Sequence, residues 1–228
     1  MHTHALSDVV QRMDNAARQA GRPSARLLAV SKLQPAEAVA ALAAAGQRAF
    51  GENYVQEAQA KQAALGDAAA DLEWHLIGHL QSNKAAIAAA LFDWVQTVDR
   101  TKLVPLLAAA RPGGRSPLNV LVQVNIDDEA SKHGCRPEEV DGLADAVAAD
   151  PRLRLRGLMA IPAPLPDPAR RRAAFARMKR LFDGLSARHE SVDTLSMGMS
   201  DDLELAIAEG ATLVRVGTAL FGARPARG

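Results

Sequence analysis

Eight short apolar runs alternate with eight helical stretches along this chain, and this alternation restricts the possible folds more than any other feature. The β-rich runs span residues 27–31, 47–51, 73–78, 93–98, 119–126, 154–160, 192–197 and 212–217. A predicted helix follows each run, after Pro35, Asn53, Ser82, Arg100, Pro137, Ala169, Ser200 and Thr218. Repeated βα units form parallel sheets covered by helices. Eight of them predict an α/β protein with a closed (β/α)8 TIM barrel.

The length of the chain agrees with one barrel. It has 228 residues, and barrels of this kind need about 200 or more, so we expect a single domain over residues 1–228. The alternative is an open doubly wound sheet, which more often stops at about five or six strands. An amphipathic helix that ends at Gly21 precedes the first strand. Its apolar positions are Leu6, Val9, Val10, Met13, Ala16 and Ala17.

Composition excludes several functional classes. The net charge of +1 provides no basic surface for nucleic acid. Cys135 is the single cysteine, which excludes an intramolecular disulfide and a cysteine-rich zinc site. No run approaches the roughly 18 apolar residues of a membrane span, and the N-terminus lacks the features of a signal peptide. We therefore expect a cytoplasmic protein, most simply a monomer, with no nucleic-acid or membrane partner.

The loops after strands seven and eight of a barrel commonly bind phosphate. Here they read SMGMS at 196–200 and RVGT at 215–218. Glycine lets backbone N–H groups approach an anion, and serine and threonine add hydroxyl donors, so the two loops predict a phosphate site. Two observations oppose this: Ser200 could simply cap the following helix, and Asp201 and Asp202 would repel a phosphate unless they point away from it.

The first strand, LLAVSK, ends on Lys32, whose amine could reach solvent or line the barrel mouth. In a closed barrel, strand one lies beside strand eight, so Lys32 and the phosphate site share one mouth. An amine next to a phosphate site suits pyridoxal 5'-phosphate (PLP), whose aldehyde forms a Schiff base with lysine. The other lysines fall on predicted helices or loops, where we expect solvated amines. They are Lys61, Lys84, Lys102, Lys132 and Lys179.

Arg215 lies two residues before Gly217 and so faces the same side of its strand. It could form an ion pair in the barrel with Asp99 or Glu52. It could instead donate to the pyridine nitrogen of PLP. Because arginine keeps its proton, that nitrogen would stay unprotonated and the ring would be a weak electron sink.

Three further polar residues leave alternatives open. Asn53 with Gln56 fits a capping box for the following helix, and Asn53 could also contact the cofactor. His75 alternates within a strand and could pack in the wall, while His79 lies in the next loop and could line the mouth. Two histidines without a third ligand are a weak metal signal, so we predict no metal site.

Six segments carry a resemblance to a known family. They read AVSKLQP, FGENYVQEA, WHLIGHLQSNK, LVQVNIDDEASKHG, LRGLMAIP and LSMGMSDDLELAIAEGATLVRVGTALFG. Together, from about Leu27 to Gly222, the chain resembles the pyridoxal phosphate homeostasis protein family, the YggS and PROSC group, related in fold to the N-terminal barrel of alanine racemase. The resemblance implies PLP on Lys32 as a Schiff base, and a carrier or regulator of vitamin B6 without established turnover. It also implies phosphate contacts from Ser196, Ser200, Gly217 and Thr218.

Function therefore has one leading interpretation and two alternatives. The first is a non-enzymatic PLP carrier, which could supply PLP-dependent apo-enzymes. The second is a PLP-dependent amino-acid racemase, which needs a base on each face of the substrate. Racemases of this fold take a tyrosine from an additional domain, and here the sole tyrosine, Tyr54, lies at a predicted helix start. A Schiff-base aldolase or isomerase for sugar phosphates is a weaker third.

Overall fold

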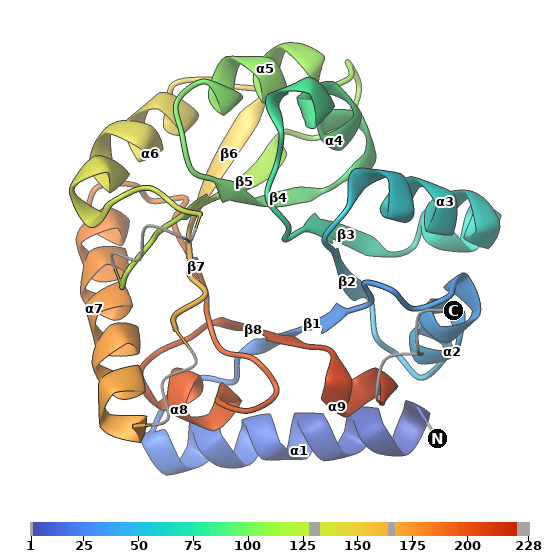
Figure 1. The fold of residues 1–228 in the computed structure, drawn as a ribbon, viewed down its shortest axis with the longest axis vertical. Helices are drawn as coiled ribbons and strands as arrows, with labels where there is room; N and C mark the ends of the chain where they lie inside the picture. Colours follow the sequence, from blue (N-terminus) through green and yellow to red (C-terminus); the bar gives the residue numbers. More distant parts are fainter. Residues whose placement is uncertain (1, 128–132, 164–166, 223–228) are drawn as a thin grey trace.

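The computed structural model describes residues 2–127, 133–163 and 167–222 (Figure 1). Eight parallel strands form a closed barrel in the order β1 to β8, and β8 pairs with β1. The predicted (β/α)8 barrel with a preceding helix is confirmed. The strands are β1 Arg26–Val30, β2 Ala49–Glu52, β3 Glu73–Leu76, β4 Trp94–Val98, β5 Leu118–Gln123, β6 Leu153–Met159, β7 Thr194–Ser196 and β8 Leu213–Val216.

Helices surround the barrel as an outer ring (Figure 1). The α-helices are α1 His2–Ala20, α2 Ala36–Ala44, α3 Val55–Leu65, α4 Ala85–Leu91, α5 Leu103–Ala110, α6 Val140–Ala148, α7 Pro168–Ser186, α8 Leu203–Ala208 and α9 Thr218–Phe221. Short 3-10 turns occur at η1 Gly66–Ala69, η2 Ser82–Lys84 and η3 Pro137–Glu139. Apart from α1, each helix follows a strand, as a βα repeat requires.

Successive strand residues face alternately into the barrel and out toward the helices. The outward side chains and the helices share one large apolar core. Two small apolar clusters lie in the barrel interior. One contains Leu28, Ala49, Ile77 and Leu213, and the other Trp94, Leu121 and Met159. Apolar side chains thus occupy part of the interior, and the mouth is where barrels of this kind bind their ligands.

Helix α1 lies outside the barrel against α8 and α9 (Figure 1). Its buried residues are Val9, Met13, Ala16 and Ala17. The prediction that Val10 belongs to the apolar face is wrong, because Val10 is 40% exposed; it lies about 100° around the helix from Val9. In the described residues, no helix is both long and apolar enough to cross a membrane.

Candidate functional site

Strand alternation brings three predicted site residues to the mouth of the barrel. On β1, Val30 belongs with the interior cluster, so Ser31 faces outward and Lys32 inward. On β8, Leu213 belongs to the same interior cluster, which turns Arg215 and Gly217 to the same side. Lys32 and Gly217 therefore meet across the neighbouring ends of β1 and β8.

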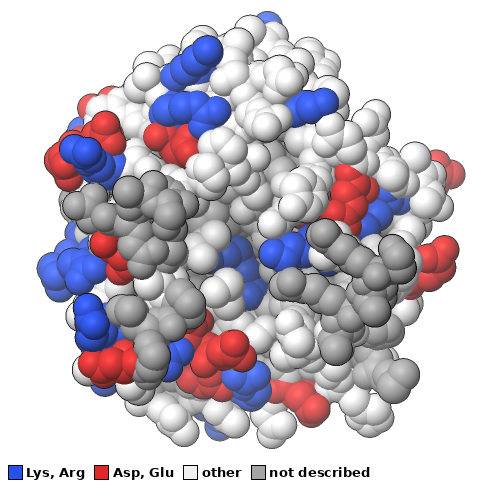
Figure 2. Space-filling model, in the orientation of Figure 1, with Lys and Arg blue, Asp and Glu red and all other residues white. Residues whose placement is uncertain are grey.

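A pocket of about 270 Å³ opens at this mouth. Its lining residues are Val30, Lys32, Asn53, Ile77, Ile161, Met199, Ser200, Asp201, Arg215, Gly217 and Thr218. Six of the seven predicted site residues are among them, all but Ser196. Figure 2 shows a hollow near the middle of this face with basic side chains inside it.

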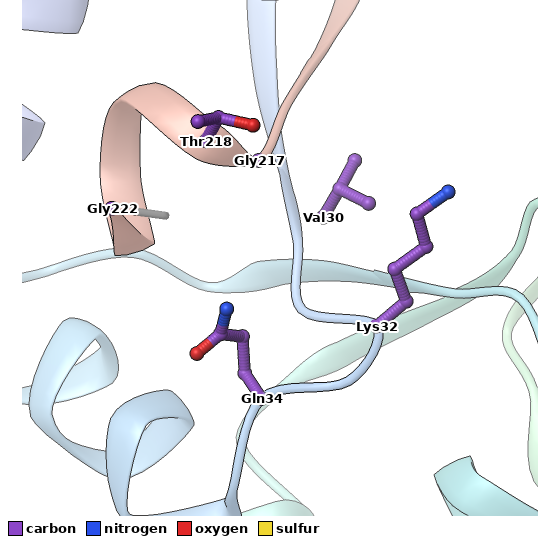
Figure 3. Close-up of a pocket in the computed structure, with 6 residues that line it drawn as sticks. All are labelled: Val30, Lys32, Gln34, Gly217, Thr218 and Gly222. Carbon is purple, nitrogen blue, oxygen red and sulfur yellow. The ribbon is translucent and has the colours of Figure 1, made fainter. Parts of the chain in front are cut away.

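A smaller pocket adjoins the first and shares Val30, Lys32, Gly217 and Thr218 with it. In Figure 3 the Lys32 side chain extends away from Gln34 and past Val30, while Thr218 stands at the start of α9. The amine and the predicted phosphate loop thus border the same space.

Ser196 is fully buried inside the barrel and holds Arg215. Arg215 Nη1 donates to Ser196 Oγ at 2.7 Å, and Nη2 donates to the Ala160 carbonyl at 2.8 Å. The alternative of an ion pair with Asp99 or Glu52 is wrong, because those carboxylates bond to Arg100 and Lys61. Burial lowers the pKa of Arg215 to about 10, so the guanidinium remains charged at neutral pH.

Hydrogen bonds continue from Ser196 through the barrel. Ser196 Oγ donates to Gln96 Oε1 at 2.7 Å, and Gln96 Nε2 donates to His75 Nδ1 at 2.8 Å. His75 Nε2 then donates to Glu73 Oε1 at 2.8 Å. We call Glu73, His75, Gln96, Ser196 and Arg215 the interior chain. It fixes the His75 tautomer, and burial lowers the pKa of this ring, so that it is neutral at pH 7.

The interior chain is not predicted from the sequence, although the sequence contains a sign of it. His75, Gln96 and Ser196 are polar residues within otherwise apolar strands, where buried polar groups need partners. The sequence places them in three different strands. Only barrel closure shows that they meet.

The loop after β7 presents Ser200 to the pocket. The interpretation of Ser200 as a helix cap is wrong, because α8 has Asp202 as its N-cap. Asp202 Oδ1 accepts from the Met199 N–H at 2.7 Å, and Asp202 is not among the residues that line the pocket. Asp201 does line the pocket and retains the predicted repulsion. Arg12 of α1 donates to the Ser200 carbonyl at 3.0 Å and so supports this loop from outside.

Glycine is required in this loop at position 198. Gly198 has φ of 91°, and a Cβ there would lie 2.4 Å from the Ala206 Cβ of α8. The loop can therefore pack on α8 only with glycine.

Asn53 lines the pocket and is not a helix cap. Helix α3 has Tyr54 as its N-cap, with no side-chain capping bond, so the predicted capping box is wrong. Tyr54 is 57% exposed and, with Gln56, His79 and Lys84, lines a neighbouring groove that shares Asn53 with the pocket. The extended backbone of Tyr54 moves the start of α3 one residue along the chain, and this leaves Asn53 at the end of β2.

Lys61 is buried, against the expectation of a solvated amine. Its Nζ donates to the Ser31 carbonyl at 2.6 Å and to carboxylate oxygens of Glu52 and Glu57, both at 2.7 Å. These three acceptors satisfy the ammonium group in place of water. Burial raises the pKa of Glu52, although Lys61 and Ser31 oppose this shift.

His79, Asp99 and His133 bring ligand-type atoms within 4.8 Å of one another at the mouth. The rings of His79 and His133 stack with centroids 3.7 Å apart and planes 15° from parallel. Imidazole binds a metal in the plane of its ring, and two parallel planes do not converge on one point. The two histidines therefore form a stacked ring pair. The absence of a metal site stays a prediction.

Comparisons with known proteins agree with this geometry. The family described as "Alanine racemase, N-terminal domain" matches residues 4–225. The pyridoxal phosphate homeostasis protein of Pseudomonas aeruginosa is 56% identical over 221 residues, 96% of this chain and 94% of that protein. The protein of the same name from Escherichia coli K12 is 51% identical over 224 residues, 97% and 96% of the two chains. The structure of PipY from Synechococcus elongatus with PLP bound is 39% identical, with a TM-score of 0.83 over 97% of this chain and 100% of that chain.

Proposed function

The chain belongs to the alanine racemase N-terminal domain family and within it to the pyridoxal phosphate homeostasis proteins, and from this premise we propose that it holds PLP as a carrier or regulator in vitamin B6 homeostasis. The observation that carries the proposal is one pocket bordered by Lys32, Ser200, Arg215, Gly217 and Thr218. When bound, PLP supplies an aldehyde that condenses with an amine and releases one water. We assign that amine to Lys32.

The start of α9 suits the phosphate. Helix α9 begins at Thr218, and the first N–H groups of a helix have no partner within it. A Cβ at Gly217 would lie 3.3 Å from the Val30 carbonyl, so glycine keeps the cradle open beside Lys32. The carboxylate of Asp201 repels an anion, which favours Thr218 and Gly217 as principal phosphate contacts, with Ser200 adding a hydroxyl.

Arg215 suits the other end of the cofactor. Its guanidinium is held by Ser196 and Ala160 and still lines the pocket. Donation to the pyridine nitrogen from an arginine that is charged at neutral pH leaves that nitrogen unprotonated, which weakens the ring as an electron sink. This electronic setting disfavours reactions that need strong electron withdrawal by the ring.

The lining of the pocket supports a protein without turnover. Racemisation needs a base on each face of the substrate carbon. Among the lining residues only Lys32 and Asp201 can serve as bases, and Asp201 belongs to the loop assigned to the phosphate. Tyr54 lines the neighbouring groove and is not among the residues that line this pocket. We also propose that the whole chain acts as one domain, as a cytoplasmic monomer, and that PLP-dependent apo-enzymes receive the cofactor.

Loading the purified protein with PLP tests the proposal. We expect a yellow protein whose visible absorption band survives gel filtration. Lys32→Ala should lose the band, whereas the matched variant Lys84→Ala, in the neighbouring groove, should keep it. A colourless wild type after loading would contradict the assignment.

A second measurement separates a carrier from a racemase. The loaded protein is incubated with each amino acid in turn, and optical rotation is followed. We expect no loss of optical activity. Measurable turnover would refute the carrier interpretation and favour the racemase.

A further inference from the structure

The backbone immediately after Lys32 has an unusual conformation. Leu33 has φ of 63°, and in the described part of the chain it is the one residue other than glycine with positive φ. The left-handed region is unfavourable for residues with a Cβ, and such residues persist where surrounding contacts hold them, often at functional sites. Leu33 is 37% exposed, so packing of its side chain does not explain the conformation.

Hydrogen bonds on both sides of Lys32 hold this turn. The Leu33 N–H donates to Glu57 Oε1, and the Gln34 N–H donates to the Ser31 carbonyl at 3.0 Å. Lys61 Nζ binds the same Glu57 oxygen and the same Ser31 carbonyl. The residue before Lys32 and the residue after it are thereby joined through one ammonium group.

The network has a buried anchor behind the barrel wall. Glu52 Oε1 accepts from Lys61 at 2.7 Å and from Ser31 Oγ at 2.5 Å. We call Ser31, Glu52, Glu57 and Lys61 the Lys61 clamp. Lys61 and Glu52 side chains are 7% and 0% exposed, so water cannot replace either partner.

The clamp is not built for stability alone. Among the described residues, Glu52 Oε2 is buried with no hydrogen-bond partner, which is unfavourable, and Leu33 adds backbone strain. Helix α3 is already anchored by the buried side chains of Val55 and Ala58. Fastening α3 to the barrel would not require a left-handed leucine beside the pocket lysine.

We propose that Lys61, acting through Glu57 and Ser31, is a positioning residue that presents the Lys32 amine to the pocket. This inference rests on the proposed function, since it assigns Lys32 to PLP. Without the clamp, Leu33 relaxes to a negative φ, the adjacent peptides rotate, and Lys32 no longer holds its place on the pocket wall. The proposed phosphate contacts, Ser200, Gly217 and Thr218, follow β7 and β8 and should be unaffected.

Glu57→Ala tests the clamp, because Glu57 is 21% exposed and its loss leaves no fully buried ion behind. We expect PLP affinity, read from the visible band in a titration, to fall about tenfold, as for loss of a hydrogen bond to a charged group. Amide exchange at Leu33 should become faster. The thermal midpoint should stay close to wild type. Glu57→Gln, which keeps an acceptor, should fall in between.

A matched rescue separates positioning from general damage. Glycine adopts positive φ without steric cost, so Leu33→Gly in the Glu57→Ala background should restore PLP affinity several-fold. Leu33→Ala in the same background, which removes the rest of the side chain but keeps the Cβ, should not. If Glu57→Ala does not fold, the same pair is made in Glu57→Gln.

The outcomes distinguish this inference from the proposed function. If wild type takes up no PLP, the proposed function is refuted and the inference is refuted with it. If wild type binds PLP and Glu57→Ala binds it equally well, only the positioning role is refuted. Equal recovery with Leu33→Gly and Leu33→Ala, or no recovery with either, also refutes it.

Discussion

Two buried polar networks reach the mouth of the barrel from opposite sides of its wall. The interior chain runs inside the barrel from Glu73 to Arg215 through hydrogen bonds of 2.7–2.8 Å. The Lys61 clamp lies behind the wall, between β1, β2 and α3. Each holds a basic residue at the pocket: the interior chain holds Arg215, and the clamp flanks Lys32. A closed barrel can therefore orient a side chain from within or from behind.

The two networks differ in where their charges lie. The middle links of the interior chain are neutral and directional, and each donor has one acceptor. The clamp joins an ammonium to two carboxylates, one of them fully buried. Removing one member of a buried ion pair leaves an uncompensated charge, which costs more than a neutral bond. We therefore expect the clamp to be the more sensitive network.

Lys61→Met should have the largest effect on stability. It leaves the buried Glu52 without its cation, and breaking a buried pair costs about 3–5 kcal/mol. Urea denaturation measures this, with Lys84→Met as a control expected within about 0.5 kcal/mol of wild type. Adding Glu52→Gln to Lys61→Met should recover part of the loss, because the two residues are coupled. Additive losses would contradict the coupling.

Ser196→Ala should rank second and act on the interior chain. It leaves Arg215 Nη1 and Gln96 Oε1 without their shared partner, at a cost of about 1–3 kcal/mol. It should also weaken PLP binding through Arg215 while leaving the band on Lys32 visible. Ser186→Ala on the exposed end of α7 is the control. A Ser196→Ala protein with wild-type stability would show that the hydrogen bonds of the interior chain do not stabilise the fold.

Acid should destabilise the far end of the interior chain. Burial alone would raise the pKa of Glu73, but bonds from His75 and Arg26 outweigh it and lower the pKa to about 2. A depressed carboxyl pKa stabilises the fold above about pH 4.5, and this stabilisation is lost as pH falls toward 2. The lowered pKa of His75 also reduces the stability of the fold in acid. The unfolded ring takes up a proton below about pH 6.5, and the buried ring resists it.

Denaturation midpoints between pH 7 and pH 3 check this slope. Glu73→Gln should show a shallower decline than wild type. The Glu73 side chain is 32% exposed, so water screens its interactions with His75 and Arg26. We therefore expect Glu73→Gln to change stability less than Ser196→Ala. If the midpoints of the two proteins fall equally with pH, groups other than Glu73 cause the acid sensitivity.

Arg12→Ala should give the smallest change. Its ion pair with Glu204 is exposed, at 39% and 47%, and such pairs contribute about 0–1 kcal/mol. The same change frees the Ser200 carbonyl, so a small loss of PLP affinity is expected without a matching loss of stability. Arg18→Ala on the same helix is the control and should change neither quantity.

Much of the site could be predicted because, in a barrel, the order of the strands in the sequence determines which strand ends are neighbours. Once eight βα units are recognised, Lys32, Gly217 and Thr218 must lie at neighbouring strand ends. The errors concern groups whose surroundings come from distant segments. Lys61 is expected in water from the sequence, because two of its acceptors, Ser31 after β1 and Glu52 on β2, are distant in the chain. Ser196 belongs to the predicted phosphate loop, yet its partners are on β4 and β8.

The sequence by itself determined the barrel, the place of Lys32 just after β1 and the glycine-rich loops after β7 and β8. These follow from local periodicity and from the conformational freedom of glycine, both of which act over a few residues. The tertiary structure decided which polar groups are paired. Burial removes water from a donor, and only a folded neighbour can then supply the acceptor. For that reason the ammonium of Lys61, which looks solvated in the chain, is buried behind Lys32.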